Sequence, residues 1–143
     1  MSVKHVKGDL FTSRDHLCHC VSADFRMGAG IAVKFKEMFG NQEQLQNMNL
    51  GPGQIAVMEL EDNLKTTKKY IYYLVTKEKY FQKPTYGRLR ACLQAMRKHI
   101  DEHHVTRVSM PKIGCGLDKL NWNLVEDMIR QELSGIHVTV YSL

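Results

Sequence analysis

Apolar residues along the chain follow two different periods. Short runs rich in apolar and β-branched residues predict strands, and apolar stripes at intervals of three and four residues predict helices. The predicted strands cover residues 3–7, 17–21, 54–60, 70–76, 105–110 and 136–141, and the predicted helices cover residues 31–39, 42–50, 87–103 and 122–133. Strands that alternate with amphipathic helices indicate a sheet covered on both faces. The pattern predicts an α/β fold with three α/β/α layers.

The strongest helix signal lies in residues 87–103. Its stripe is formed by five apolar residues at helical spacing, namely Leu89, Cys92, Leu93, Met96 and Ile100. A short polar loop joins strands 54–60 and 70–76, so these two strands could pair antiparallel, while helices separate the others. We expect a mixed, mostly parallel sheet of about six strands.

Length and composition limit the classes of protein. The chain has 143 residues and 16.5 kDa, with 43% hydrophobic and 24% charged residues, which predicts one folded domain over residues 1–143. No apolar run is long enough to span a membrane, and the first residues lack the apolar core of a secretory signal. We therefore expect a nuclear and cytoplasmic protein without a membrane partner, acting as a monomer.

The four cysteines indicate neither a disulfide framework nor a metal site. Cys18 and Cys20 flank His19 without the spacing of a zinc knuckle, and no second cluster supplies further ligands. In a strand, Cys18 and Cys20 would share one face and His19 would take the other. We interpret the cysteines as small buried hydrophobic residues and expect no metal.

The net charge of +5 and the pI near 9.0 favour an anionic ligand such as a nucleotide, a nucleic acid or a phosphorylated group. The densest basic cluster, residues 65–69, reads more simply as a solvated loop between two strands. Basic residues interleaved with aromatics, as in RNA-recognition motifs, do not occur. The hypothesis of a nucleic-acid-binding protein therefore rests on charge alone.

Two glycine-rich segments, residues 26–32 and 111–118, each lie between a predicted strand and a predicted helix. Glycine lets the backbone approach a ligand, and the N–H groups at a helix start attract anions. Val33 and Lys119 stand where a dinucleotide motif requires its third glycine, and no Walker sequence occurs. Two such loops facing each other would clamp a pyrophosphate.

Three charged residues lie near these loops. Lys77 follows an apolar strand, where partial desolvation favours the neutral amine that acts as a nucleophile. Asp118 ends the second glycine-rich segment, and Asp9 follows the first strand; either could transfer protons. Simpler interpretations remain open: a solvated strand end for Lys77, a helix N-terminal charge for Asp118 and a turn residue for Asp9.

Several of these segments together resemble the macro domain family. The resemblance is carried by residues 6–11, 19–22, 26–32, 70–77, 83–86, 109–118 and 138–141, and it covers essentially the whole chain. Within the family, residues 27–32, 76–77 and 111–118 are similar to single-domain enzymes that remove terminal ADP-ribose from proteins.

The resemblance implies that the ligand is ADP-ribose and that the chain is a hydrolase. Such enzymes release ADP-ribose from modified glutamate and aspartate side chains, and family members also act on O-acetyl-ADP-ribose or ADP-ribosylated nucleic acid. By position, Lys77 matches the lysine that attacks the anomeric carbon of the distal ribose to form a ring-opened Schiff base. Asp118 matches the acid/base that opens the sugar and resolves the adduct. Neither a cofactor nor a metal is implied.

The resemblance also implies a set of binding residues. Asp9 would bind the adenine, Ser22 and residues 28–31 would follow the distal ribose and phosphates, and residues 113–117 would close the other side of the pyrophosphate. Tyr141 is a further candidate near the adenine. The full set is Asp9, Leu10, Ser22, Met27, Gly28, Ala29, Gly30, Ile31, Thr76, Ile113, Gly114, Cys115, Gly116, Leu117, Tyr141 and Leu143.

The chain departs from the family pattern just after Lys77, in residues 78–81, where the change could alter how bulky an acceptor is admitted. The expected partners are ADP-ribose and ADP-ribosylated proteins, with ADP-ribosylated nucleic acid as an alternative. A macro domain that only reads ADP-ribose marks is the other alternative. Lys77 and Asp118 favour the enzyme, because a reader has no need of that lysine.

Overall fold

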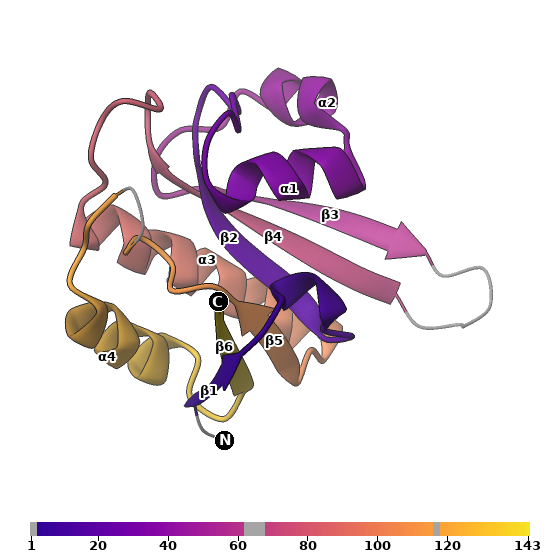
Figure 1. Cartoon of the computed structure of the whole chain (residues 1–143), viewed down its shortest axis with the longest axis vertical. Coiled ribbons are helices and arrows are strands. Elements are labelled where there is room, and N and C mark those ends of the chain that lie inside the picture. The colour runs from indigo at the N-terminus through magenta and orange to yellow at the C-terminus, as the bar shows by residue number, and fades with distance from the viewer. Residues whose placement is uncertain (1–2, 62–67, 116–117) are drawn as a thin grey trace.

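The computed structural model of the chain describes residues 3–61, 68–115 and 118–143. Its strands are β1 (Val3–Lys7), β2 (His16–Ser22), β3 (Ile55–Glu61), β4 (Lys68–Lys77), β5 (Arg107–Met110) and β6 (His137–Ser142). Its helices are a 3-10 helix, η1 (Leu10–Thr12), and α1 (Ile31–Phe39), α2 (Gln42–Asn47), α3 (Tyr86–His103) and α4 (Trp122–Glu132). Figure 1 shows their arrangement.

The strands form one mixed sheet in the order β1-β6-β5-β2-β4-β3. All neighbouring pairs are parallel except β3 and β4, which pair antiparallel. The chain between Glu61 and Lys68 is too short for the crossover that a parallel pair requires, so β4 returns beside β3 in the opposite direction. The prediction of a mixed, mostly parallel sheet is confirmed.

Helices cover both faces of the sheet (Figure 1). One face packs against α3 and α4 through a cluster that includes Tyr72 and Leu74, and the other packs against α1 and α2 through Tyr73 and Val75. Strand β4 is buried on both faces, which explains why its sequence is a continuous apolar run instead of an alternating one. The three-layer α/β/α prediction is confirmed.

Some boundaries differ from the sequence prediction. Helix α2 ends at Asn47, because Asn49 has a positive φ of 52° and Pro52 follows. Strand β5 begins only at Arg107, because His104 ends α3 in the left-handed conformation and Val105 N–H donates back to Ile100. Helix η1 was not predicted, and a carboxylate cap from Asp9 begins it.

The carboxyl ends of β2, β4 and β5 meet at one edge of the sheet, where ligands bind in open α/β folds. A bulge shifts the register of β2 against β4 between Val21 and Ser22. Just beyond it, Ala23 N–H donates to the carbonyl of Lys77 at 2.8 Å and fixes the end of β4. Within the described ranges, no helix combines the length and apolar character needed to cross a membrane.

Candidate functional site

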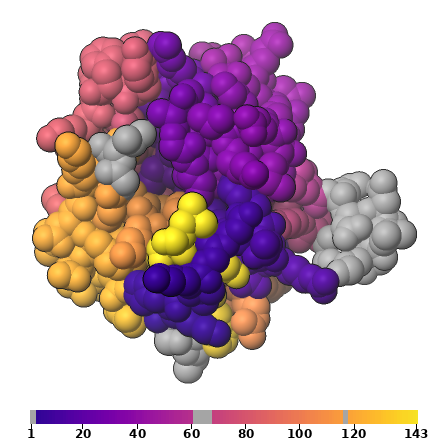
Figure 2. Space-filling view, in the orientation of Figure 1, coloured from indigo at the N-terminus to yellow at the C-terminus, as the bar shows by residue number. Residues whose placement is uncertain are grey.

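A cavity of about 890 Å³ opens at this edge of the sheet. Its walls come from the loop between β2 and α1, the chain after β4, the loop after β5 and the end of β6. Figure 2 shows the surface hollowed where the purple, orange and yellow parts of the chain meet. A volume of several hundred Å³ accommodates a ligand of nucleotide size.

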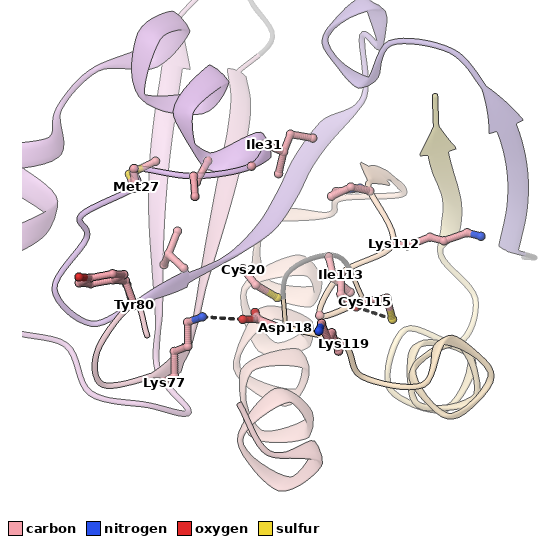
Figure 3. Close-up of a pocket in the computed structure, with 18 of the residues that line it drawn as sticks. Cys20, Met27, Ile31, Lys77, Tyr80, Lys112, Ile113, Cys115, Asp118 and Lys119 are labelled. Carbon is pink, nitrogen blue, oxygen red and sulfur yellow. Dashed lines mark hydrogen bonds and ion pairs between the residues drawn. The ribbon is translucent and has the colours of Figure 1, made fainter. Parts of the chain in front are cut away.

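Lys77 and Asp118 face each other inside this cavity (Figure 3). Lys77 is the last residue of β4, and Asp118 lies in the loop between β5 and α4. The Lys77 Nζ donates to Asp118 Oδ1 at 2.5 Å, and the side chains are only 12% and 17% exposed. Lys77 is thus not a solvated strand end. The arrangement places an amine beside a carboxylate that can exchange protons with it.

The first glycine-rich segment, residues 26–32, forms one wall of the cavity beside the start of α1. Gly30 is the N-cap of α1 with a φ of 62°, a conformation that side-chain-bearing residues rarely adopt. Ile31 and Ala32, in the first turn, line the cavity. The N–H groups of Ile31 and Ala32 have no acceptor one turn earlier in the helix, so this wall can hold an anion.

The second glycine-rich segment forms the opposite wall with Ile113, Gly114 and Cys115. Gly114 has a φ of 72°, and a Cβ there would stand 2.8 Å from Leu120 Cδ1. Leu120 N–H donates to the Gly114 carbonyl at 2.7 Å, which closes the turn. The predicted contacts Gly116 and Leu117 lie outside the described residues. The two loops line opposite walls of one cavity, the arrangement that could hold a pyrophosphate between them.

Most other predicted binding residues also line the cavity, namely Ser22, Met27, Gly28, Ala29, Tyr141 and Leu143. The Tyr141 ring lies close to Gly8, because a Cβ added at Gly8 would stand 3.9 Å from Tyr141 Cδ2. Tyr141 therefore brings the end of β6 against the chain that precedes Asp9.

Three predicted binding residues lie outside the cavity wall. The Asp9 carboxylate accepts from Phe11 N–H at 2.9 Å, and Leu10 is buried in the core on the α1 side. Thr76 is also buried, and within the described residues its Oγ1 has no hydrogen-bond partner. Their roles toward a ligand stay predictions, and Asp9 also fills the turn role that the sequence left open.

Cys20 lines the cavity although the sequence predicted a purely structural role. Its partner at i−2, Cys18, is buried in the core, and His19 stacks on Phe35 on the other face, as strand alternation predicts. Burial raises the pKa of Cys20 well above its usual value, and the nearby Cys18 adds to the effect. Because the thiol stays protonated, Cys20 is a poor nucleophile.

The rim beside Lys77 contains residues outside the predicted binding set, although the sequence analysis connected residues 78–81 with the size of the acceptor. Arg26, Tyr80 and Phe81 line the cavity, and the Arg26 guanidinium carbon lies 4.3 Å from the centre of the Tyr80 ring. Asp24 accepts a hydrogen bond from Tyr80 N–H at 3.3 Å. The sequence signal for this part of the site is a pair of aromatic residues in a charged segment directly after a predicted strand.

Within residues 3–61, 68–115 and 118–143, no group of three or more histidine, cysteine or acidic side chains is placed to hold a metal ion. The described cysteines are all free thiols.

Comparisons with known proteins match this chain to one family. The family described as Macro domain matches residues 18–129. The bovine and human proteins named ADP-ribose glycohydrolase OARD1 are each 48% identical over 145 residues, covering 99% of this chain and 91% of the relative.

Solved structures agree on the fold. The macrodomain of Thermus aquaticus DarG superposes with a TM-score of 0.85 at 24% identity, covering 99% of both chains. Thermosipho africanus DarTG, in complex with ADP-ribose, gives a TM-score of 0.82 at 21% identity, covering 96% of this chain and 41% of that one. By sequence and by fold, the chain belongs to the macro domain family.

Proposed function

We propose that this protein is an ADP-ribose hydrolase that releases ADP-ribose from modified glutamate and aspartate side chains of proteins. The observation that carries the proposal is the Lys77–Asp118 pair, 2.5 Å apart and largely buried between two glycine-rich loops. The names of the human and bovine relatives, and the ADP-ribose bound to a structural neighbour, support the same ligand.

The cavity suggests how ADP-ribose would lie in it. The pyrophosphate would lie between the start of α1 and residues 113–115, where backbone N–H groups replace the water that solvates an anion. The adenosine would point toward Tyr141, and the distal ribose toward Lys77 and Asp118. The modified side chain would then leave the cavity past Lys77.

In the proposed reaction, the Lys77 amine acts as the nucleophile. Its lone pair forms a bond to the anomeric carbon of the distal ribose, and the bond from that carbon to the acceptor carboxylate oxygen breaks. The carboxylate leaves with the bonding electrons, and Asp118, hydrogen-bonded to Nζ, takes a proton from the nitrogen. Asp118 then returns a proton to the ring oxygen as the ring opens, which gives a lysine Schiff base.

Water completes the cycle. It adds to the imine carbon while Asp118 accepts one of its protons, and the carbon–nitrogen bond then breaks with proton return to Nζ. The products are ADP-ribose and the free amine, so one water is consumed for each ester cleaved. O-acetyl-ADP-ribose carries the same kind of leaving group, and we propose that it is also a substrate.

The test is release of ADP-ribose from a glutamate-modified protein, compared between wild type, Lys77→Ala and Asp118→Ala. We expect release by wild type and loss in both variants, with ADP-ribose binding retained. Cyanoborohydride added during turnover should attach ADP-ribose to a peptide that contains Lys77, since it reduces an imine to a stable amine.

Two results would contradict the proposal. Binding of ADP-ribose by all three proteins without release by any would indicate a reader of ADP-ribose marks. Release without a trapped adduct, and with Lys77→Ala still active, would exclude the Schiff-base route and leave Asp118 to activate water directly.

A further inference from the structure

Two aromatic side chains stand exposed on the cavity rim just beyond Lys77. Tyr80 is 50% exposed and Phe81 71% exposed, and both line the cavity. Their ring centres are 5.4 Å apart at an interplanar angle of 89°. Large apolar side chains exposed at the mouth of a binding cavity indicate contact with a ligand or partner. We call Tyr80 and Phe81 the aromatic rim.

The aromatic rim is tied to the first glycine-rich loop through Asp24. The Asp24 carboxylate accepts from Ser22 Oγ at 2.5 Å, from Arg26 N–H at 3.2 Å and from Tyr80 N–H at 3.3 Å. Arg26 also covers one face of the Tyr80 ring. Tyr80 is therefore positioned by contacts with the loop between β2 and α1, in addition to its place in the chain.

The position of the rim identifies the part of the substrate that it meets. The two glycine-rich loops and Tyr141 occupy the walls that would hold the pyrophosphate and adenosine. The rim lies on the Lys77 side of the cavity, as Figure 3 shows for Tyr80. If Lys77 attacks the anomeric carbon, the group on the far side of that carbon is the acceptor. The rim thus faces the acceptor.

Charges around the rim distinguish two classes of acceptor. The Asp24 carboxylate lies beside Arg26 and close enough to Lys79 for an electrostatic effect, and Lys83 also lines the cavity. Hydrogen bonds from Ser22 and Arg26 hold the pKa of Asp24 below its usual value against the opposing effect of burial, so it keeps its charge. Binding along a phosphate backbone calls for a continuous basic surface, which this mixture does not provide. A polypeptide suits rings among mixed charges.

We propose that Tyr80 and Phe81 are specificity-determining residues that contact the polypeptide flanking the ADP-ribosylated side chain, and that Asp24 is the positioning residue that holds Tyr80 in place. The inference rests on the proposed function and names the part of the substrate that the site selects. It explains why two large apolar side chains remain exposed here. The polypeptide of the substrate would cover these two side chains when it binds.

A pair of substrates tests this. One is a peptide of about ten residues with a single ADP-ribosylated glutamate, and the other is O-acetyl-ADP-ribose, which carries an acetyl group in place of a polypeptide. We expect Tyr80→Ala and Phe81→Ala each to raise KM for the peptide by about three- to tenfold, in line with the contribution of a single aromatic contact. The KM for O-acetyl-ADP-ribose should rise by a smaller factor than the KM for the peptide. Leu124→Ala is the matched control, because Leu124 is also 50% exposed but lies on α4.

Asp24 is tested by the same comparison. Asp24→Ala should raise the peptide KM more than the KM for O-acetyl-ADP-ribose. Asp24→Asn, which keeps an accepting oxygen for Tyr80 N–H, should restore most of the difference. A merely structural role would instead change both substrates by the same factor and would give no rescue.

Each remaining outcome decides the proposal. Equal effects on both substrates, or no effect on either, would overturn it. An effect confined to an ADP-ribosylated single-stranded oligonucleotide would overturn the polypeptide assignment. If wild type hydrolyses neither substrate, the proposed function fails, and affinities for the modified peptide and for free ADP-ribose then test the rim. Weaker peptide binding alone in Tyr80→Ala would still support it.

Discussion

Lys77 and Asp118 are 41 positions apart in the sequence, yet their Nζ and Oδ1 atoms lie 2.5 Å apart. Parallel pairing produces this approach, because β2, between β4 and β5, brings the carboxyl ends of both strands to one edge. Partial burial of both side chains strengthens their interaction relative to an exposed ion pair. The two groups therefore constitute one chemical unit.

Because Lys77 and Asp118 act as one unit, replacing either residue should remove most of the rate enhancement that the pair provides. We expect Lys77→Ala and Asp118→Ala each to lower kcat by about 10²- to 10⁴-fold, the range attributed to a positioned acid/base. The double variant should lose little more than the worse single variant, because either change alone disables the proton exchange. Single-turnover release of ADP-ribose from the modified peptide measures all three rates.

The control for this prediction is the stability of each variant. Removing one partner of a largely buried pair leaves the other charge unpaired, so unfolding in urea must confirm that each variant is folded at the assay temperature. Losses that multiply in the double variant would contradict the prediction and indicate two independent roles.

The sequence predicted the architecture well because its signals are local. The stripe from Leu89 to Ile100 lies on the inner face of α3, and Gly40 and Asn121 flank helices as their cap preferences indicate. Helix η1 escaped prediction because its cause is a single carboxylate, Asp9, bonded two residues ahead. Such a cap adds no apolar period.

The site was less predictable, because its parts meet only in the folded chain. The resemblance to the macro domain family is confirmed and pointed to Lys77 and Asp118, and the structure brings both into the cavity. The link from Asp24 to Tyr80 spans 56 positions and runs through a backbone N–H. Side-chain type carries no signal for such a bond.

Gly114 and Gly40 form a matched pair for testing the second cavity wall. Both have positive φ, 72° and 62°, but a Cβ on Gly40 meets no atom within 4 Å, whereas one on Gly114 displaces Leu120. We expect each alanine variant to lose about 1–3 kcal/mol of stability, because alanine is strained at these positive φ values. Gly114→Ala should in addition weaken ADP-ribose binding about tenfold, because residues 113–115 line the cavity.

Urea unfolding and calorimetric titration with ADP-ribose measure the two effects. The methyl group on Gly114 meets the flexible end of the Leu120 side chain, so most of the disturbance should move the loop and leave the core intact. Equal affinities in the two variants would show that this loop does not contact the ligand.

His19 lies fully buried between β2 and α1, stacked on Phe35 with ring centres 3.7 Å apart. Within the described residues, neither ring nitrogen has a hydrogen-bond partner. Burial lowers the pKa of His19 to about 3 from its ordinary value of 6.5. The folded protein therefore keeps this ring neutral in a range where the unfolded chain takes up a proton.

The sign of the effect follows from that difference. Between pH 6.5 and 3 the unfolded state binds the extra proton, so the stability that is present above pH 6.5 is lost as the pH falls. Lowering the pH from 7 to 5 should reduce the free energy of unfolding by about 2 kcal/mol through this group.

His19→Phe keeps the stacked ring without the ionisable nitrogens, so its free energy of unfolding should depend less on pH by that amount. His104→Asn, at an exposed position whose left-handed φ of 56° Asn tolerates, is the control for removing a histidine. Urea unfolding at pH 7 and 5 measures all three proteins, and parallel wild-type and His19→Phe curves would show that His19 already takes up its proton in the folded state.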